Sequence, residues 1–447
     1  MVIQNSFKDR EEELGILKKY LKSNKFEFLI IYGRRRIGKT ELILEGTKNM
    51  KRIYYLATTE KNLERFYMLC SKFFPEVSNL KQDWETLFDF LKDKVDIIII
   101  DEFQNLIEEN KNILSIFQSI VDLKLKNTKL KLIIIGSSIS VMTSMLNYKS
   151  PLYGRKTFSM EIKPLSFFEL KKFFPRYNAK MLIEIYGFAD GIPYYLIKID
   201  KEFWKWLGEE LKKRETFLKD EIDFIMRDEF EDLSTYKLIL EAIAFGKRTI
   251  NEIKNFIGVK RTDIIPYIKN LIEVKMVKRI VPITQNEKSR FGRYYLSDNF
   301  INFWFRYIYP NLSSIEEGIF DISIIKEDYN TYLGKVFEEV CKQFLIRNRD
   351  KVFKFTKIGK WWYKDKEIDI VALNEITKEI AFCECKWKEN VDAEEILGKL
   401  EEKAKNVEWN VDKRKEYYII FAKSFEEKIK ENNVFLFDLS DIESSMK

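Results

Sequence analysis

Glycine, lysine and threonine residues follow an apolar run near the start of the chain, at a spacing suited to binding phosphate. The run Phe28–Tyr32 is typical of a buried strand. After it comes the pattern G-x-x-x-x-G-K-[ST], whose positions are Gly33, Arg34, Arg35, Arg36, Ile37, Gly38, Lys39 and Thr40. The glycines let backbone N–H groups curve around an anion, and a helix beginning near Lys39 directs its positive end at that anion. We expect Lys39 to contact the β and γ phosphates of a nucleoside triphosphate and the Thr40 hydroxyl to hold Mg²⁺.

Two carboxylates follow a second buried strand further along the chain. Four consecutive isoleucines, Ile97–Ile100, predict a strand buried on both faces of a parallel sheet, and Asp101 and Glu102 come directly after it. Taken alone, such acids more often cap a helix. The α/β proteins bind ligands at the carboxyl ends of strands, which is where these acids and the upstream loop are expected. We therefore predict that Asp101 holds Mg²⁺ and that Glu102 aligns the attacking water.

Two further loops offer weaker candidates. The strand predicted at Lys131–Ile135 ends in Gly136-Ser-Ser138, where a hydroxyl could contact the γ-phosphate or simply cap a helix. The loop Pro151–Arg155 could offer Arg155 to a phosphate, or Arg155 could be a plain surface arginine.

The last part of the chain contains a second set of acids with a lysine. Strands at Glu367–Leu373 and Glu379–Trp387 predict a hairpin, in which Glu384 and Lys386 share one face. A turn centred between Ile376 and Thr377 would place Asp369 opposite Glu384. Nuclease chemistry needs such a set: Asp369 and Glu384 would hold Mg²⁺, and Lys386 would orient a water or steady the developing charge.

A third acid for this set is expected on the preceding helix, Thr331–Ile346, where Glu338 lies nearer the buried stripe than Glu339. The alternative is a solvated, charged hairpin, because D-x(14)-E-x-K is a weak pattern by itself. Opposed like charges destabilise a hairpin, however, so the cluster favours a cation. Cys383 and Cys385 alternate with Glu384 and are expected in the core.

The elements around these residues predict an α/β chain of several domains. We expect a P-loop ATPase core with a parallel sheet at residues 1–165 and a helical lid at 166–233. A winged helix-turn-helix is expected at 234–310, a connector at 311–328 and an α/β restriction-endonuclease-like domain at 329–447. In the first domain, Asp9 and Glu12 would cap a helix that follows them. In the last, a strand is expected at Val352–Phe355 before the hairpin.

The winged helix-turn-helix is predicted from three helical patterns and two short strands, which lie at 237–245, 250–256, 263–274, 277–282 and 293–296. Lys260, Arg261 and Thr262 precede its third helix, which carries Lys269, and the wing carries Lys288, Arg290 and Arg293. This basic stripe suits contacts with DNA phosphates, although winged helices of ATPases also serve as packing modules.

Composition narrows the classes of function. The 447 residues contain no histidine, which excludes His-dependent zinc sites and Ser-His or Cys-His nucleophile pairs. Four scattered cysteines indicate a reducing compartment, and a net charge of +7 permits a nucleic-acid partner without requiring one. With no signal-peptide pattern and no run long enough to span a membrane, a cytoplasmic location is expected.

In combination, these motifs resemble the archaeal ATPase family within the AAA+/STAND group of P-loop proteins. The resemblance also covers the segments Phe7–Glu13 and Gly191-Ile-Pro193, and a C-terminal half like the domain of unknown function often fused to these ATPases, followed by a PD-(D/E)xK-type module. It implies that Phe7–Glu13 and Pro193 pack against adenine. It also implies that Arg155 is an arginine finger, which would act in trans only within a ring or dimer of the chain.

Three functions remain open from the sequence. The first is an ATP-binding switch that hydrolyses ATP to ADP and phosphate and is coupled to DNA. The second is a Mg²⁺-dependent DNA endonuclease gated by ATP. The third is a nucleotide-regulated DNA-binding or scaffold protein with an inert nuclease-like fold.

Overall fold

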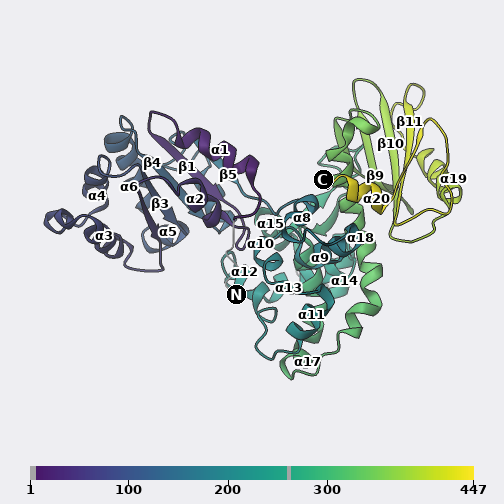
Figure 1. The fold of residues 1–447 in the computed structure, drawn as a ribbon, viewed down its shortest axis with the longest axis horizontal. Helices are drawn as coiled ribbons and strands as arrows, with labels where there is room; N and C mark the ends of the chain where they lie inside the picture. The colour runs from purple at the N-terminus through teal and green to yellow at the C-terminus, as the bar shows by residue number, and fades with distance from the viewer. Residues whose placement is uncertain (1–6, 259–262, 447) are drawn as a thin grey trace. The chain divides into compact units, whose positions relative to one another are not determined.

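The computed structural model describes residues 7–258 and 263–446, and it divides the chain into two units (Figure 1). The first unit contains the chain up to Pro164 together with Phe224–Glu231. The second contains Leu165–Asp223 and the chain from Asp232 onward.

The first unit is built on a parallel five-stranded sheet of order β2-β3-β4-β1-β5, which confirms the predicted α/β class. Its strands are β1 (Glu27–Tyr32), β2 (Arg52–Leu56), β3 (Ile97–Asp101), β4 (Lys131–Gly136) and β5 (Phe158–Glu161). Its helices are α1 (Glu11–Leu21), α2 (Lys39–Gly46), α3 (Asn62–Phe73), α4 (Trp84–Leu91), α5 (Gln104–Glu109), α6 (Ile113–Ser119) and α7 (Ile139–Met145).

Both faces of this sheet are buried, which explains the unbroken isoleucine runs of its central strands. Ile30, Ile98 and Ile134 belong to one hydrophobic core, and Ile31, Ile99 and Ile133 belong to another on the opposite face. The carboxyl ends of β1, β3 and β4 therefore meet at one edge of the sheet, where the loops after them carry the candidate residues.

The second unit begins with helices and a two-stranded hairpin. The helices are α8 (Leu170–Phe173), α9 (Ala179–Ala189), α10 (Pro193–Leu196), α11 (Phe203–Leu211), α12 (Glu221–Met226, whose last residues belong to the first unit), α13 (Ser234–Ala244), α14 (Ile250–Ile257), α15 (Ile265–Glu273), α16 (Asn299–Phe303), α17 (Leu312–Glu316) and α18 (Ser323–Arg347). Antiparallel β6 (Val277–Ile280) and β7 (Arg293–Leu296) form the hairpin. Short 3₁₀ or π segments of the chain are Pro75–Asn79, Ile120–Leu125, Phe167–Glu169, Trp304–Ile308, Tyr309–Asn311 and Arg349–Lys351.

The C-terminal part of the second unit is a mixed five-stranded sheet of order β12-β11-β10-β9-β8. Its elements are β8 (Lys357–Tyr363), β9 (Lys366–Asn374), β10 (Glu379–Lys386), α19 (Ala393–Ala404), β11 (Lys415–Ala422), β12 (Val434–Phe437) and α20 (Leu439–Ser444). The β9–β10 register pairs Ile370 with Cys383, so the turn is centred as predicted. The recorded pairing ends there, one step before Asp369 would face Glu384.

Two local predictions are wrong. Arg10, in a left-handed conformation and without a side-chain capping bond, precedes α1 in place of an Asp9 cap, because residues 9 and 10 both have positive φ and turn the chain there. Val352–Phe355 forms no strand, and the edge strand β8 starts at Lys357 instead. The stretch 311–328, predicted as a connector, contains α17 and the start of the 25-residue α18.

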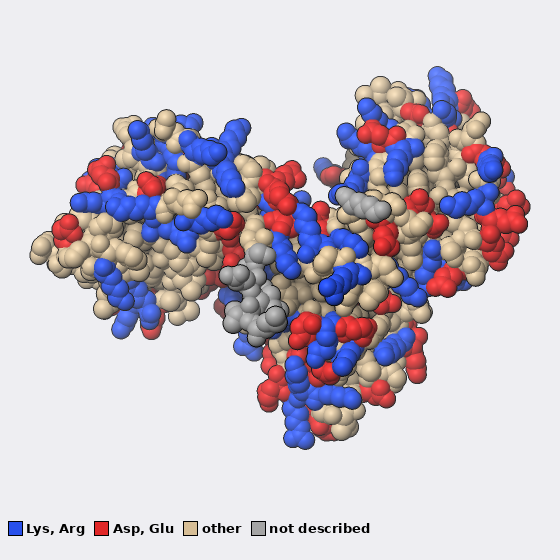
Figure 2. All heavy atoms as spheres, viewed as in Figure 1, with Lys and Arg blue, Asp and Glu red and all other residues tan. Residues whose placement is uncertain are grey.

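Basic and acidic side chains are interspersed on the face that Figure 2 shows, in keeping with the small net charge. Among the helices of the described ranges, none is both long and apolar enough to cross a membrane.

Candidate functional site

The loop Gly33–Gly38 has a backbone that requires glycine at both ends. Gly33 has φ +147°, and a Cβ built there would lie 2.4 Å from the Ile162 carbonyl oxygen and 2.7 Å from the Ile37 side chain. Gly38 has φ +84° and directly precedes α2, so the chain enters that helix through a left-handed residue. The loop therefore curls tightly at the carboxyl end of β1.

Lys39 is buried at the first position of α2 and lies inside this loop. Its Nζ donates to the carbonyl oxygens of Gly33 and Arg34, each at 2.9 Å. Burial lowers the pKa of Lys39 to about 8, and the nearby carboxylates of Glu102 and Asp101 raise it in part. The loop thus holds a charged ammonium group close to both acids that follow β3.

Thr40 and Asp101 are brought together by the pairing of β1 and β3 through β4. The Thr40 hydroxyl donates to Asp101 Oδ2 at 2.6 Å, and Tyr54 from β2 donates to the same oxygen at 2.9 Å. Hydroxyl and carboxylate oxygens are donors that Mg²⁺ prefers, so this pair fits the ion that the sequence predicts. Tyr54 was not predicted; only the adjacency of β2 and β3 places it here.

Glu102 lies next to Asp101 with φ +52°, and its side chain is held by two donors. Ser137 Oγ donates to Glu102 Oε2 at 2.6 Å, and Gln104 Nε2 donates to the same oxygen at 2.5 Å. Gln104 also donates to Ser137 Oγ at 2.9 Å. The loops after β3 and β4 therefore fix one carboxylate beside Lys39, and Gln104 is a residue that sequence reasoning missed.

The remaining residues predicted to serve the nucleotide site have different partners. Arg10 from the Phe7–Glu13 segment donates to the Ile37 carbonyl oxygen at 2.9 Å, which ties that segment to the loop. The guanidinium groups of Arg35 and Arg36 lie over the Phe224 ring. Arg155 forms a two-pronged ion pair with Asp122, with Nη2 at 2.8 Å from Oδ2. Pro193 belongs to the second unit, where it begins α10.

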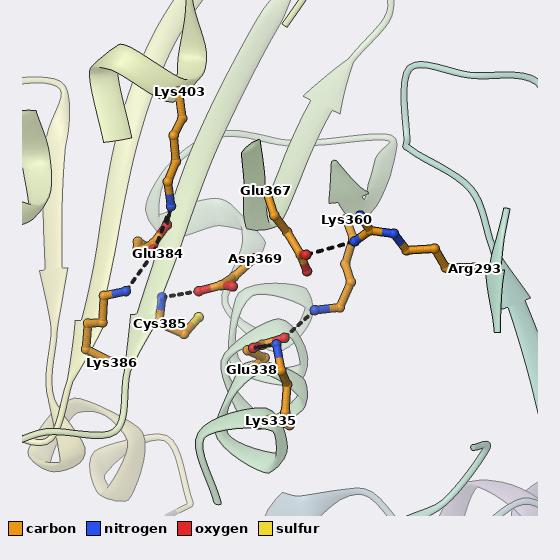
Figure 3. Close-up of polar contacts among 10 residues, drawn as sticks. All are labelled: Arg293, Lys335, Glu338, Lys360, Glu367, Asp369, Glu384, Cys385, Lys386 and Lys403. Atoms are coloured by element: carbon orange, nitrogen blue, oxygen red, sulfur yellow. Dashed lines mark hydrogen bonds and ion pairs between the residues drawn. The ribbon is translucent and has the colours of Figure 1, made fainter. Parts of the chain in front are cut away.

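The second set of predicted residues gathers where β9 and β10 diverge (Figure 3). The backbone N–H of Cys385 donates to Asp369 Oδ2 at 2.9 Å. Glu384 Oε1 lies 2.7 Å from Lys386 Nζ, and Glu384 Oε2 lies 2.9 Å from Lys403 Nζ on α19. Lys403 was not predicted, because its position on a helix after the hairpin gives no spacing signal.

Glu338 on α18 contributes a further carboxylate to this cluster. It is buried and forms ion pairs with Lys335 of the same helix and with Lys360 of β8. Burial raises the pKa of Asp369 well above its usual range, and the charges of Glu338, Cys385 and Glu384 raise it further. Within the described ranges no group of three or more His, Cys, Asp and Glu side chains is arranged around a metal position.

The cysteines of β10 point into the core as predicted. Cys383 and Cys385 are both buried, and Cys385 interacts with Cys341 of α18. Their thiols pack between the sheet and α18, while the backbone N–H of Cys385 holds Asp369 of the acid cluster.

The hairpin β6–β7 turns one of its basic residues inward. Arg293 Nη1 lies 2.8 Å from Glu367 Oε2, and its guanidinium group lies 4.6 Å from the centre of the Trp362 ring. Lys269, Lys288 and Arg290 remain exposed. Lys260 and Arg261 lie outside the described residues.

Comparison with protein families matches both halves of the chain. Residues 7–199 match an ATPase domain found predominantly in Archaea, which supports binding and hydrolysis of ATP. Residues 304–396 match archaeal and bacterial proteins of unknown function, as the resemblance of the C-terminal half predicted.

Curated relatives come from Methanocaldococcus jannaschii. The uncharacterized protein MJECL04 is 56% identical over 441 residues, which cover 97% of this chain and 99% of that protein. The uncharacterized ATP-binding protein MJ0423 is 47% identical over 45 residues, which cover 10% of this chain and 76% of that protein.

Among solved structures, the Walker-type ATPase PABY2304 of Pyrococcus abyssi is similar, with a TM-score of 0.52 and 21% identity. The match covers 68% of this chain and 97% of that one. At this identity the likeness concerns the fold alone.

Proposed function

We propose that this chain is a MgATP-hydrolysing switch whose nucleotide state is passed to a DNA-facing C-terminal half. The chain belongs to the same family as MJECL04 of M. jannaschii and contains an archaeal ATPase domain. The proposal of ATP hydrolysis rests on one observation, that the loops after β1, β3 and β4 lie together at one edge of the sheet. There Thr40 donates to Asp101, and Lys39 lies close to Glu102.

Each residue of this edge has a proposed task. Backbone N–H groups of Gly33–Gly38 and the ammonium group of Lys39 bind the phosphates, and Thr40 and Asp101 hold Mg²⁺. When bound, Mg²⁺ neutralises charge that develops on the phosphate oxygens. Glu102 orients the attacking water, and its bonds from Ser137 and Gln104 keep the carboxylate in one place.

The test is ATP turnover and nucleotide retention in purified protein. We expect Glu102→Gln to retain ATP without turnover and Lys39→Ala to bind ATP poorly. Glu108→Gln, an exposed acid on the neighbouring α5, is the matched control and is expected to behave as wild type. Undiminished hydrolysis in Lys39→Ala would refute the proposal.

The DNA-facing part of the proposal is supported by the exposed basic residues of α15 and the β6–β7 loop, which would contact phosphates. Because Arg293 is paired with Glu367, we assign those contacts to Lys269, Lys288 and Arg290. Binding through phosphates weakens steeply as salt rises. Replacing both Lys288 and Arg290 by Ala should lower the slope of log affinity against log salt.

A second candidate function is Mg²⁺-dependent DNA cleavage at the Asp369 cluster. It is favoured by a half-buried carboxylate, Asp369, surrounded by Glu384, Glu338 and several lysines (Figure 3). We propose that Asp369 and Glu384 hold the metal and that Lys386 faces the phosphodiester, with ATP acting as a gate.

Incubating linear and supercoiled DNA with Mg²⁺ or Mn²⁺ tests this. Asp369→Asn and Lys386→Ala should each abolish cleavage and leave ATP turnover intact, whereas Asp412→Asn in an exposed loop should change neither. DNA binding by wild type without any strand cleavage would instead favour the scaffold interpretation.

A further inference from the structure

A short segment far along the chain lies against the phosphate loop. Phe224–Glu231, here named the acidic strap, belongs to the first unit, although the chain on both sides of it belongs to the second. Asp228 forms an ion pair with Arg35 Nε. The Phe224 ring centre lies 4.6 Å from the guanidinium carbon of Arg35 and 4.9 Å from that of Arg36.

The same strap holds the loop that follows β4. Glu229 Oε1 accepts from the backbone N–H of Ile139 at 2.6 Å, and Glu229 Oε2 accepts from Ser140 Oγ at 2.6 Å and from Ser138 Oγ at 3.1 Å. Ser138 directly follows Ser137, which holds Glu102. One segment therefore connects the loop after β1 with the loop after β4, at the edge where the triphosphate is proposed to bind.

The strap also brings negative charge to this edge. Asp228 is close enough to affect Lys39 and to be affected by Glu102. Burial raises the pKa of Asp228 to about 6, Arg35 lowers it, and Glu102 raises it. A bound triphosphate would add several negative charges next to these carboxylates and would compete for the same arginines.

We propose that the acidic strap is an autoinhibitory contact: with the strap docked, Asp228 and Glu229 occupy Arg35 and the start of α7, and binding of MgATP releases them. This inference rests on the proposed ATP site. Because the chain runs from the second unit into the strap and back, release of the strap is the step that reports nucleotide binding to the second unit.

Two measurements on the full chain test the strap. The affinity for a fluorescent ATP analogue with Mg²⁺ is compared between wild type, Asp228→Asn and the double variant Asp228→Asn/Glu229→Gln. Hydrogen exchange of residues 224–231 is followed with and without a non-hydrolysable ATP analogue. Glu231→Gln is the matched control, because it removes an equal charge from an exposed residue of the same strap.

If only molecules with the strap released bind nucleotide, the apparent affinity is the intrinsic affinity multiplied by the fraction of such molecules. The double variant is therefore expected to bind the analogue roughly tenfold more tightly than wild type. Asp228→Asn should lie between the two, and Glu231→Gln should bind like wild type. In wild type, the nucleotide should increase exchange over 224–231.

Two results would overturn the proposal that the strap is autoinhibitory. The first is equal affinity in all variants with exchange over 224–231 unchanged or reduced, which leaves the proposed ATP site standing. The second is absence of nucleotide binding in wild type and variants alike, which refutes the proposed function and the strap together. Exchange protection of β3 and β4 shows in each variant that the first unit is folded.

Discussion

The buried position of Lys39 predicts how ATP binding depends on pH. Its Nζ donates to two carbonyl oxygens, and burial lowers the pKa of Lys39 to about 8. A triphosphate binds the ammonium form. Below pH 8 most molecules already have that form, whereas above pH 8 a proton must be taken up before or during binding.

The size of the effect follows from this pKa. If only the charged form binds, the apparent dissociation constant rises about twofold at pH 8 and about tenfold at pH 9 relative to neutral pH. Burial and Asp101 raise the pKa of Tyr54, a neighbouring group, beyond this interval. The loss of affinity above pH 8 is therefore assigned to Lys39.

The assay is titration with a fluorescent ATP analogue between pH 7 and 9.5, at constant ionic strength and free Mg²⁺. Lys39→Met is the control, because it should bind weakly at every pH without the decline above pH 8. Affinity in wild type that stays level to pH 9.5 would show that Lys39 keeps its proton, and the argument from burial would be refuted.

Four further outcomes are expected. The free energy of unfolding should rise by on the order of 3 kcal/mol between about pH 8 and pH 10.5, because in this range the unfolded state holds more protons than the folded state. Urea unfolding of wild type and of Lys39→Met measures this rise. Ser137→Ala should lower kcat about tenfold at an unchanged KM, because one of two bonds to Glu102 is lost; equal turnover would remove Ser137 from the mechanism. Gly33→Ala should abolish ATP binding by collision with the Ile162 carbonyl, whereas Gly334→Ala, with open space in α18, should raise stability by roughly 0.5–1 kcal/mol; thermal melts and ATP titrations separate the two. Arg293→Met should loosen the β6–β7 hairpin, seen as faster hydrogen exchange over 277–296, and unchanged exchange would mean that the Glu367 pair adds little.

Local patterns in the sequence were enough to predict the central strands of the first unit's sheet and its phosphate loop, but not the edge strand β5. The isoleucine runs of β3 and β4 predict strands buried on both faces, and their burial in two opposite cores confirms this. The spacing from Gly33 to Thr40 predicts a tight loop followed by a helix, and α2 begins at Lys39. The turn between β9 and β10 was also predictable, because alternation and pairing fix its centre.

Local patterns failed where a residue's partner comes from a distant element. Asp9 has the side chain of a helix cap, but the chain turns through positive φ at residues 9 and 10, and Arg10 instead reaches the Ile37 carbonyl. Arg293 looks like a phosphate ligand in sequence, yet the packing of the hairpin on β8 and β9 pairs it with Glu367.

The residue types of the phosphate loop, and the position of Asp101 and Glu102 at the end of a buried strand, could be predicted from the sequence because each depends on one short segment. Their partners are fixed by the tertiary fold: Tyr54 and Thr40 donate to Asp101, Ser137 and Gln104 donate to Glu102, and the acidic strap contacts Arg35 and Arg36. The order of the strands and the position of residues 224–231 at the sheet edge depend on how whole helices and strands are buried against one another. The spacing of residues within one segment contains no information about such long-range packing.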